Sequence, residues 1–422
     1  MRLKTFVVCI AFAAWCPAES APAADSWPEF RGPTGQGISG ARGLPLEWGP
    51  STNVAWKVAV PGKGWSSPSI RAGRVVLTTA VESPDKRKLA LHALCFDAAT
   101  GKSLWDTEVF SHDRSGLPSI HSKNSHASPT PLIEGERVYV HFGHLGTACL
   151  DVEGKVVWRT NEIKYEPVHG SGGSPIVVGS ALIFSCDGSS DPFVAALDKE
   201  TGKVRWRTPR GGDPPKKFSF STPLLITVKG QEQVVSPGSG AVCAYEPASG
   251  RELWRVRYEG YSVVPRPVFA QGLVFVSTGY DEPKVLAIRP DGAGDVTDTH
   301  VAWSLRKGAP LTPAMLSSGS ELYLLADNGV ATCVDALSGK THWQKRACGS
   351  ASASPILAEG RIYAVDEEGR CIVLQPSLEH VKLAENDLAE RTLASPAAID
   401  GALFLRSDRH LWRISIAGPK RP

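Results

Sequence analysis

The sequence predicts an all-β protein, an eight-bladed β-propeller of four-stranded antiparallel blades that an N-terminal strand closes into a ring. Two recurring phrases support this prediction. In the first, a strand ends at an Asp, a Thr-Gly turn follows and a second strand ends on Trp, as at Asp198, Thr201-Gly202 and Trp206. In the second, a Ser-Pro or Thr-Pro pair (once Arg266-Pro267) opens an apolar strand. Eight such starts recur about every 47 residues, a spacing typical of propeller blades.

Each period has room for four short strands. Residues 132–133 lead through a Gly turn to the apolar residues 138–140, and residues 148–150 lead through a second Gly turn to residues 156–158. Proline at the start of the first strand is tolerated because its missing N–H lies at the strand end. Four strands per period is the number that a propeller blade needs.

The last repeat is incomplete, which predicts how the ring closes. After Ser395-Pro396 only two further strands fit, at residues 403–405 and 411–414. The strand at residues 51–60 carries Trp56 at the position where the fourth strand of the other repeats carries its Trp. It is therefore expected to complete the last blade. Closure removes exposed sheet edges. The predicted propeller therefore spans residues 51–416, after an irregular arm at 24–50 that is expected to lie on the surface, and before a tail at 417–422.

Residues 1–23 have the features of a secretory signal peptide. Arg2 and Lys4 precede an apolar stretch at residues 6–15, and Ala21-Pro22-Ala23 supplies a small-residue cleavage site. No later stretch is long and apolar enough for a transmembrane helix. The formal net charge is only +3, and no concentrated basic patch points to nucleic acid. We expect an exported, monomeric ring in the periplasm or cell envelope, or secreted.

The cysteines predict neither a zinc site nor a disulfide framework. Beyond residue 23 they are widely spaced, odd in number and without a Cys-x-x-Cys pair. Cys95, Cys149 and Cys333 occupy the same place in their repeats, and equivalent places lie far apart in a ring. They are expected to be small buried strand residues.

The repeated Asp and Trp residues are expected to be structural. Asp97, Asp198 and Asp335 can accept backbone N–H groups in the turns that follow them. The repeated tryptophans can pack between neighbouring blades and bury large apolar areas. They are Trp56, Trp105, Trp158, Trp206, Trp254, Trp303 and Trp343.

A candidate ligand site lies on the face opposite the Thr-Gly turns, where the chain enters each innermost strand. Aromatic, imidazole and polar side chains around a concave mouth are typical of a small-ligand or peptide site. The candidates are Trp65, His121, Asn124, His126, His169, Phe218, Tyr261 and Arg266, with Phe220, Lys307 and Arg391 in equivalent places. Loops on the same face add His141, His144, Asp187, Asp191, Tyr280, Asp281, Asp327 and Asp366.

Six of the eleven histidines fall between His112 and His169. Imidazoles near carboxylates can hold Zn²⁺, Cu²⁺ or Fe²⁺, and the metal candidates are His121, His126, His141, His144 and His169. Alternatively, they hydrogen-bond backbone within a long linker, since no spacing fixes a metal geometry. No catalytic residue is assigned. The Asp-rich insertion at residues 289–300 lacks a Ca²⁺-loop pattern and is expected to be a solvated turn.

The Asp-x-x-Thr-Gly-x-x-x-Trp phrase resembles the Trp-docking repeat of quinoprotein-like eight-bladed propellers. That superfamily includes the pyrroloquinoline-quinone alcohol dehydrogenases and the BamB lipoprotein of the barrel-assembly machinery. The segments at residues 27–33, 126–131 and 294–297 are similar to exported quinoprotein-repeat proteins. The resemblance implies a BamB-like, non-enzymatic exported scaffold that binds a protein segment or a cell-envelope glycan.

The alternative is a quinone- or metal-dependent oxidoreductase that uses the funnel face. Resemblance to the quinone dehydrogenases would imply a disulfide of adjacent cysteines beside the cofactor, Glu, Asn and Asp around Ca²⁺, and an Asp base. The sequence has no Cys-Cys pair and no matching acidic arrangement. No resident cofactor is therefore predicted, and the quinone belongs only to the alternative.

Overall fold

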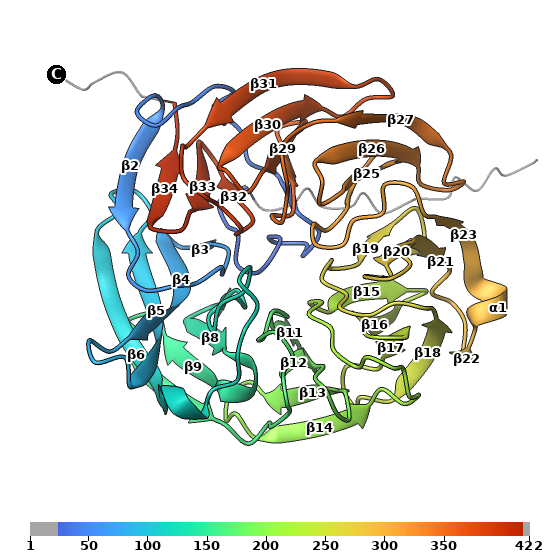
Figure 1. The fold of residues 1–422 in the computed structure, drawn as a ribbon, viewed down its shortest axis with the longest axis horizontal. Helices are drawn as coiled ribbons and strands as arrows, with labels where there is room; N and C mark the ends of the chain where they lie inside the picture. Colours follow the sequence, from blue (N-terminus) through green and yellow to red (C-terminus); the bar gives the residue numbers. More distant parts are fainter. Residues whose placement is uncertain (1–23, 417–422) are drawn as a thin grey trace, which may run out of the picture.

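The computed structural model describes residues 24–416, so the predicted signal peptide (1–23) and tail (417–422) lie outside the described residues. Eight antiparallel blades surround a central channel (Figure 1). Each blade runs from a three- to five-residue inner strand to an outer strand at the rim. The predicted all-β, eight-bladed propeller is confirmed.

Within each blade the four strands follow one another from the channel outward. Blades 1 to 4 consist of β3 (Ser69–Arg71), β4 (Arg74–Glu82), β5 (Lys88–Asp97), β6 (Ser103–Asp113); β7 (Leu132–Glu134), β8 (Arg137–His141), β9 (Thr147–Asp151), β10 (Val156–Thr160); β11 (Ile176–Val178), β12 (Ala181–Cys186), β13 (Phe193–Asp198), β14 (Val204–Pro209); and β15 (Leu224–Val228), β16 (Gln231–Pro237), β17 (Ala241–Tyr245), β18 (Glu252–Arg257). Blades 5 to 8 consist of β19 (Val268–Ala270), β20 (Leu273–Ser277), β21 (Val285–Ile288), β23 (Val301–Leu305); β24 (Leu316–Ser318), β25 (Glu321–Leu325), β26 (Val330–Asp335), β27 (Thr341–Arg346); β28 (Ile356–Ala358), β29 (Arg361–Val365), β30 (Arg370–Gln375), β31 (Val381–Asp387); and β32 (Ala397–Ile399), β33 (Ala402–Arg406), β34 (His410–Ile414), β2 (Val54–Ala59).

Two blades carry a fifth strand, which joins in parallel. β1 (Ile38–Ser39) pairs with the inner strand of blade 7, and β22 (Gly294–Asp295) pairs with the outer strand of blade 4. The described helices are short: α1 (Thr297–His300) and two 3-10 turns at Arg114–Gly116 and Gly143–Leu145. Within residues 24–416, no helix is long and apolar enough to cross a membrane.

Each repeated Trp except Trp254 joins its blade to the next one through an indole N–H bond. Trp206 Nε1 donates to the carbonyl of Pro247, 3.0 Å away in the turn of the following blade. Its ring covers Gly250, where an added Cβ would lie 2.5 Å from ring carbons. The Gly of the Thr-Gly turn is therefore needed because the tryptophan of the preceding blade lies on it. Equivalent indole-to-carbonyl bonds join Trp105 to Val152, Trp158 to Lys199, Trp303 to Ala336 and Trp343 to Ser377.

The repeated Asp residues organise the turns, as predicted. Asp198 Oδ1 accepts the backbone N–H of Thr201 at 3.0 Å and its hydroxyl at 2.9 Å. Gly202 then adopts φ +72°, the left-handed conformation that favours glycine. Asp97 and Asp335 make the same pair of bonds in their own turns.

The insertion at residues 289–300 is more ordered than the expected solvated turn. It supplies β22, and Asp295 Oδ2 accepts a bond from Arg257 Nε at 2.6 Å. The strand covers part of the outer edge of blade 4, at Trp254 and Arg255, which would otherwise be exposed. Blade 5 has the insertion in place of the Thr-Gly turn, so Trp254 has no turn carbonyl of the next blade to bond. Its side chain is fully buried, and its indole N–H donates to Gln233 of its own blade at 2.8 Å.

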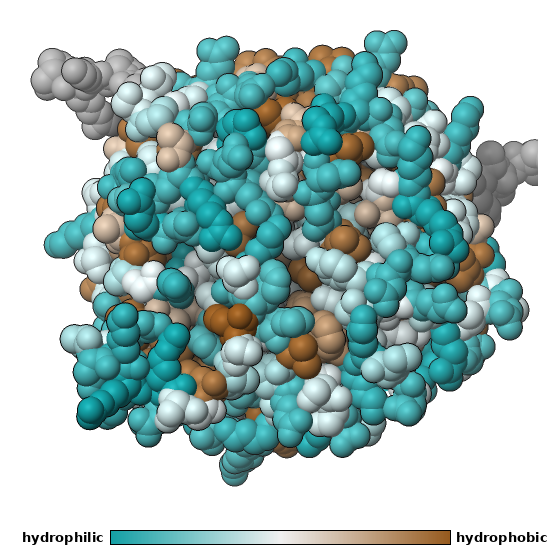
Figure 2. Space-filling model, in the orientation of Figure 1, coloured by the Kyte–Doolittle hydropathy of each residue, from teal (hydrophilic) through white to brown (hydrophobic). Residues whose placement is uncertain are grey.

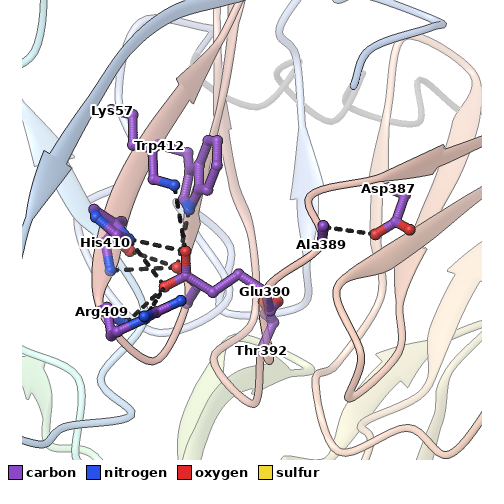
Figure 3. A network of polar contacts seen from close by, with 9 residues as sticks. Lys57, Asp387, Ala389, Glu390, Thr392, Arg409, His410 and Trp412 are labelled. Atoms are coloured by element: carbon purple, nitrogen blue, oxygen red, sulfur yellow. Dashed lines mark hydrogen bonds and ion pairs between the residues drawn. The ribbon is translucent and has the colours of Figure 1, made fainter. Parts of the chain in front are cut away.

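The ring closes as predicted. β2 pairs antiparallel with β34, and Trp56 Nε1 donates to the carbonyl of Ala98 in blade 1 at 3.2 Å. The buried carboxylate of Glu390 reinforces the joint (Figure 3). It accepts a bond from His410 Nδ1 at 2.8 Å and lies 3.5 Å from Lys57 of β2. A residue between blades 7 and 8 thus contacts both the last strand and the closing strand.

The prediction that the arm at residues 24–50 lies on the surface is wrong for its first part. Residues 27–39 run inside the ring along the innermost strands, whereas residues 42–48 pass over blades 7 and 8, where their backbone N–H groups donate to Asp400, Glu359 and Asn386 (Figure 1). Trp27 forms an antiparallel bridge with Ile70, and Trp27 and Arg31 are 0% and 1% exposed. The inner strand edges of a propeller carry unpaired N–H and C=O groups, and the arm satisfies several of them.

The cysteines at the repeated position are buried strand residues, as expected. In the described part of the chain all seven are free thiols, and six of them are buried in the blades. Cys95, Cys149 and Cys333 are at most 1% exposed.

Candidate functional site: a funnel lined by aromatic and hydroxyl side chains

The linkers that enter the inner strands surround a pocket of about 350 Å³. Six of the eight predicted ligand residues line it, namely Trp65, His121, Asn124, His169, Phe218 and Tyr261, together with Phe220 and Tyr280. Phe30 from the N-terminal arm also lines this pocket, so the arm closes the channel beneath the funnel. The face of the propeller shown in Figure 2 is largely hydrophilic, and its hydrophobic residues lie in small separate patches.

One side of the funnel is an arc of rings contributed by successive linkers. His121 and His169 have ring centroids 5.7 Å apart, His169 and Phe218 5.3 Å, and Phe218 and Tyr261 5.4 Å. Tyr280 continues the arc 6.1 Å beyond Tyr261. All but the last pair meet edge to face, the arrangement that aromatic quadrupoles favour. We call these five residues the aromatic arc.

Hydrogen bonds between linkers hold the arc in place. The carbonyl of His169 accepts the backbone N–H of His121 at 3.2 Å and the side-chain amide of Asn124 at 2.8 Å. His169 adopts φ +66°, a backbone conformation that is uncommon outside glycine and is maintained by these bonds. Similarly, the backbone N–H of Ser262 donates to the carbonyl of Phe218 at 2.9 Å.

The funnel floor is a belt of hydroxyl groups from the Ser-Pro phrases. Thr130 Oγ1 accepts the N–H of Ser67, Ser174 Oγ accepts that of Thr130, and Ser395 Oγ accepts that of Ser354, each at 2.9 Å. Each bond joins neighbouring blades, which explains why a hydroxyl residue recurs at this position. We call Thr130, Ser174, Ser354 and Ser395 the hydroxyl belt, and all four line the pocket.

The cationic groups at the rim are paired. Lys123 lies 2.5 Å from Glu367, and Lys216 lies 3.5 Å from Asp281 and 3.7 Å above the ring of Tyr261. A further pair forms between Arg391 and Asp408 at 3.5 Å, while the Arg391 guanidinium lies 5.3 Å from the Trp65 ring. The mouth of the funnel is therefore close to electrically neutral.

A second cleft of about 880 Å³ adjoins the funnel under the linker from blade 1 to blade 2. It shares Trp65, His121 and Asn124 with the funnel and adds His126 and Arg391. The predicted residue His126 thus lies beside the funnel pocket. Burial, and secondarily the nearby cation Arg114, lower the pKa of its imidazole.

The predicted metal histidines do not form one site. His141 is 1% exposed, its Nδ1 forms a hydrogen bond with Thr147 Oγ1 at 2.8 Å, and its ring lies tilted against Phe184 with the centroids 4.2 Å apart. Burial lowers the pKa of His141 to about 3 and that of His144 to about 4, so both rings are neutral at physiological pH. Over residues 24–416, no group of three or more His, Cys, Asp or Glu residues could hold a metal ion.

Arg266 is predicted at the funnel mouth but lies in the channel below it. Its side chain is 2% exposed and its Nη1 lies 3.0 Å from Glu29 of the arm. Its Nε donates to the carbonyl of Pro223 at 3.0 Å. The side chain turns away from the funnel because the arm supplies a carboxylate there, and sequence alone gives no indication of that partner.

The acidic loop residues on this face have local structural partners. The buried carboxylate of Asp187 receives two bonds from Arg210, at 2.5 and 2.8 Å. The carboxylate of Asp366 accepts a hydrogen bond from Arg370 Nε at 2.9 Å, and that of Asp327 accepts one from the backbone N–H of Leu311 at 2.7 Å. These carboxylates stabilise loops. Two further predicted residues, Asp191 and Lys307, are exposed and lie outside the lining of both cavities.

Sequence reasoning missed the hydroxyl belt, Phe30, Lys123 and Glu367. Ser174, Ser354 and Ser395 are predicted only as strand starts, and in blade 2 the predicted start is Ser128 rather than Thr130, although the regular recurrence of a hydroxyl residue before proline could have indicated a shared structural role. Glu367 follows a loop Asp of blade 7 and reaches Lys123 of the blade 1 to 2 linker, a contact between residues 244 positions apart. A pairing over that distance has no local sequence pattern.

Comparison with known proteins agrees with this architecture. The chain is 25% identical over 339 residues to outer membrane protein assembly factor BamB of Yersinia pestis, covering 78% of this chain and 69% of the relative. It is 33% identical over 153 residues to the lanthanide-dependent methanol dehydrogenase of Methylorubrum extorquens, but that match covers 32% of this chain and only 24% of the enzyme.

Two solved structures show the same fold. BamB of Moraxella catarrhalis superposes with a TM-score of 0.59 at 11% identity, covering 87% of this chain and 98% of that one. Quinohemoprotein alcohol dehydrogenase of Comamonas testosteroni superposes with a TM-score of 0.64 at 13% identity, covering 95% and 82%. The family model described as outer membrane protein assembly factor BamB matches residues 46–189, 190–322 and 295–379. The chain therefore belongs to this family of PQQ-repeat, BamB-like propellers.

Proposed function

We propose that this protein is a non-enzymatic scaffold of the cell envelope that binds a protein segment or a glycan through the funnel. The observation that carries the proposal is the aromatic arc, which brings side chains from four successive linkers and from the β20–β21 loop of blade 5 to one concave mouth. Membership of the BamB family supports a scaffold, and it favours a partner in the envelope.

A quinone cofactor does not fit the residues present. The lining of the funnel pocket includes no Asp or Glu, so it offers no carboxylate to a Ca²⁺ ion beside a quinone. The described cysteines are free and none is adjacent to another in the sequence. A quinone therefore has no part in the proposed function, and the dehydrogenase relatives support a shared fold.

Capture experiments with matched histidine variants test the scaffold proposal. A triple His121→Ala, His126→Ala, His169→Ala variant and a control His342→Ala variant are used as bait on envelope extracts. His342 lies exposed on an outer strand, remote from the funnel. The partner, identified by mass spectrometry or sugar analysis, should be retained by the control and lost by the triple variant.

The thermal unfolding midpoints of the bait proteins must agree, so that lost capture is not lost folding. A partner that both variants capture equally would refute binding through the funnel. Export is a separate part of the proposal and rests on the predicted signal peptide. Cell fractionation of the full chain and of a chain without residues 1–23 should place only the first in the envelope.

A further inference from the structure

We propose that the funnel binds a neutral oligosaccharide chain, a ligand class that rests on the proposed scaffold function and makes it specific. Four observations lead to this class. They are the occupied strand edges of the channel, the aromatic arc, the hydroxyl belt and the pairing of the rim charges.

The first observation concerns the inner edges of the blades. An extended peptide commonly binds a sheet by adding a strand to an exposed edge, with backbone hydrogen bonds supplying the affinity. In this protein the backbone of the arm pairs with the inner edges of blades 1, 2 and 7, and its Gln36 and Arg31 side chains bond backbone groups of blades 5 and 6. Trp27 and Ile70 exchange two backbone bonds of 2.7 Å, Ile133 donates to Pro28 at 2.8 Å, and Leu357 donates to Gly37 at 2.8 Å. Recognition in the funnel is therefore left to side chains.

The second observation is the shape of the aromatic arc. A pyranose ring has an apolar face of C–H groups, which packs on an aromatic face, and a polar rim of hydroxyls. Phe218 and Tyr261 are half-buried and Tyr280 is exposed, so their rings are accessible in the pocket. Rigid aromatic side chains provide such contact area with little loss of conformational freedom on binding.

The third observation is the state of the hydroxyl belt. Each of its four oxygens accepts a backbone N–H, and these hydroxyls donate to no other group in the described structure. A hydroxyl has one O–H donor besides its acceptor lone pairs. An accepted bond also polarises the hydroxyl and strengthens its donation. The funnel floor therefore offers four donors to a ligand that is rich in oxygen acceptors.

The fourth observation sets the charge of the ligand. The charged residue that lines the pocket, Lys123, is neutralised by Glu367 at 2.5 Å, and Lys216 at the rim is paired with Asp281. An acidic polysaccharide would need unpaired cations, because desolvating a carboxylate without a counter-charge is costly. Aromatic faces, free O–H donors and a neutral mouth together select neutral sugars.

Isothermal titration of the full protein tests this assignment. The probes are the neutral hexamers cellohexaose, maltohexaose, mannohexaose, xylohexaose and chitohexaose, with hexagalacturonate as the acidic probe. At least one neutral hexamer should bind with a Kd below about 1 mM. Phe218→Ala and Tyr261→Ala should each weaken that binding about tenfold. Phe218→Tyr, which keeps the ring, and His342→Ala, outside the funnel, should bind as the unaltered protein does.

Three results would overturn the proposal. These are failure of every neutral hexamer to bind the folded protein, stronger binding of hexagalacturonate, and binding that Phe218→Ala leaves unchanged. A protein partner that depends on His121 and His169, combined with no sugar binding, would refute the oligosaccharide and leave the scaffold function intact. If the protein binds no neutral hexamer and captures no partner that depends on His121 and His169, both the oligosaccharide proposal and the scaffold proposal are refuted. Matching unfolding midpoints show that the alanine variants are folded.

Discussion

Replacement of Trp206 by Ala should destabilise the ring strongly, because this tryptophan joins blade 3 to blade 4. Its side chain is 9% exposed, its indole N–H donates to Pro247 at 3.0 Å, and its ring lies on Gly250. Loss of a buried aromatic ring costs about 3–5 kcal/mol of unfolding free energy. Trp206→Phe retains most of the apolar contact and should cost about 1–2 kcal/mol, since the Pro247 carbonyl loses its donor.

The Gly250 position provides an independent test of the same contact. Gly250→Ala combines a positive φ of 73° with a Cβ that would approach the Trp206 ring to 2.5 Å. Gly230→Ala, in the same blade, has a positive φ of 81° and nothing within 4 Å of its Cβ. The control should lose about 1–2 kcal/mol from the left-handed backbone alone. Any additional loss in Gly250→Ala measures the clash with the tryptophan.

Urea unfolding followed by circular dichroism gives the comparison, with midpoints converted to free energies only where the slopes agree. Leu104→Ala serves as a surface control, because Leu104 is 45% exposed on an outer strand. If Trp206→Ala costs less than about 1 kcal/mol, or if Gly250→Ala and Gly230→Ala are equally destabilised, the tryptophan does not hold the blades together.

Three further substitutions test the closure, the histidines and the arm. Glu390→Gln should lower the free energy of unfolding by about 2 kcal/mol at pH 7. Burial alone would raise the pKa of Glu390, but the bond from His410 and other bonds to the carboxylate outweigh it and lower the pKa. The Glu390 carboxylate thus stabilises the folded protein above about pH 4.5, and this stabilisation is lost in more acid solution. The urea midpoints of the variant and the unaltered protein should therefore converge at low pH. His141→Gln should make the free energy of unfolding fall less steeply as the pH is lowered from about 6.5 to 4, because in this range His141 takes up a proton only in the unfolded chain. The difference in slope should be at most about 1.4 kcal/mol per pH unit. Parallel pH profiles for the variant and the unaltered protein would contradict this. Glu29→Ala leaves the guanidinium of Arg266 buried without its carboxylate and should cost about 3 kcal/mol, with faster proteolysis of the arm; unchanged urea midpoints would show that this pair is not needed.

The blades could be predicted because their determinants are local and repeated. The Asp198 turn is completed within three residues, and Trp206 follows at a fixed distance from it. Even ring closure was predictable, since a lone strand with Trp56 and an incomplete last blade fit only each other. Where the local phrase is missing, as at residues 289–300, the segment is solvent-exposed as expected, but the two-residue edge strand that it forms was not predicted.

The site was predictable in position but less so in detail. The linker topology places Phe218 and Tyr261 together, and the structure confirms that both line one pocket. The individual role of Arg266 depends on Glu29, a residue 237 positions away. Asp187 likewise has an expected loop position, yet its carboxylate is used by Arg210. Side-chain partners over such distances are fixed by packing, which a single sequence does not show.

The arm connects the fold to the proposed binding. Without it, the channel would be open and the inner strand edges would be free for any extended chain. With Trp27 and Arg31 buried in the channel and Phe30 at the floor, the funnel has a closed base, and the backbone edges of blades 1, 2 and 7 are paired with the arm. Binding must then depend on the side chains above that base. The quinoprotein-like fold is thus compatible with a ligand quite different from a quinone, because the arm and the linkers, rather than the repeated Trp phrase, determine what the funnel presents.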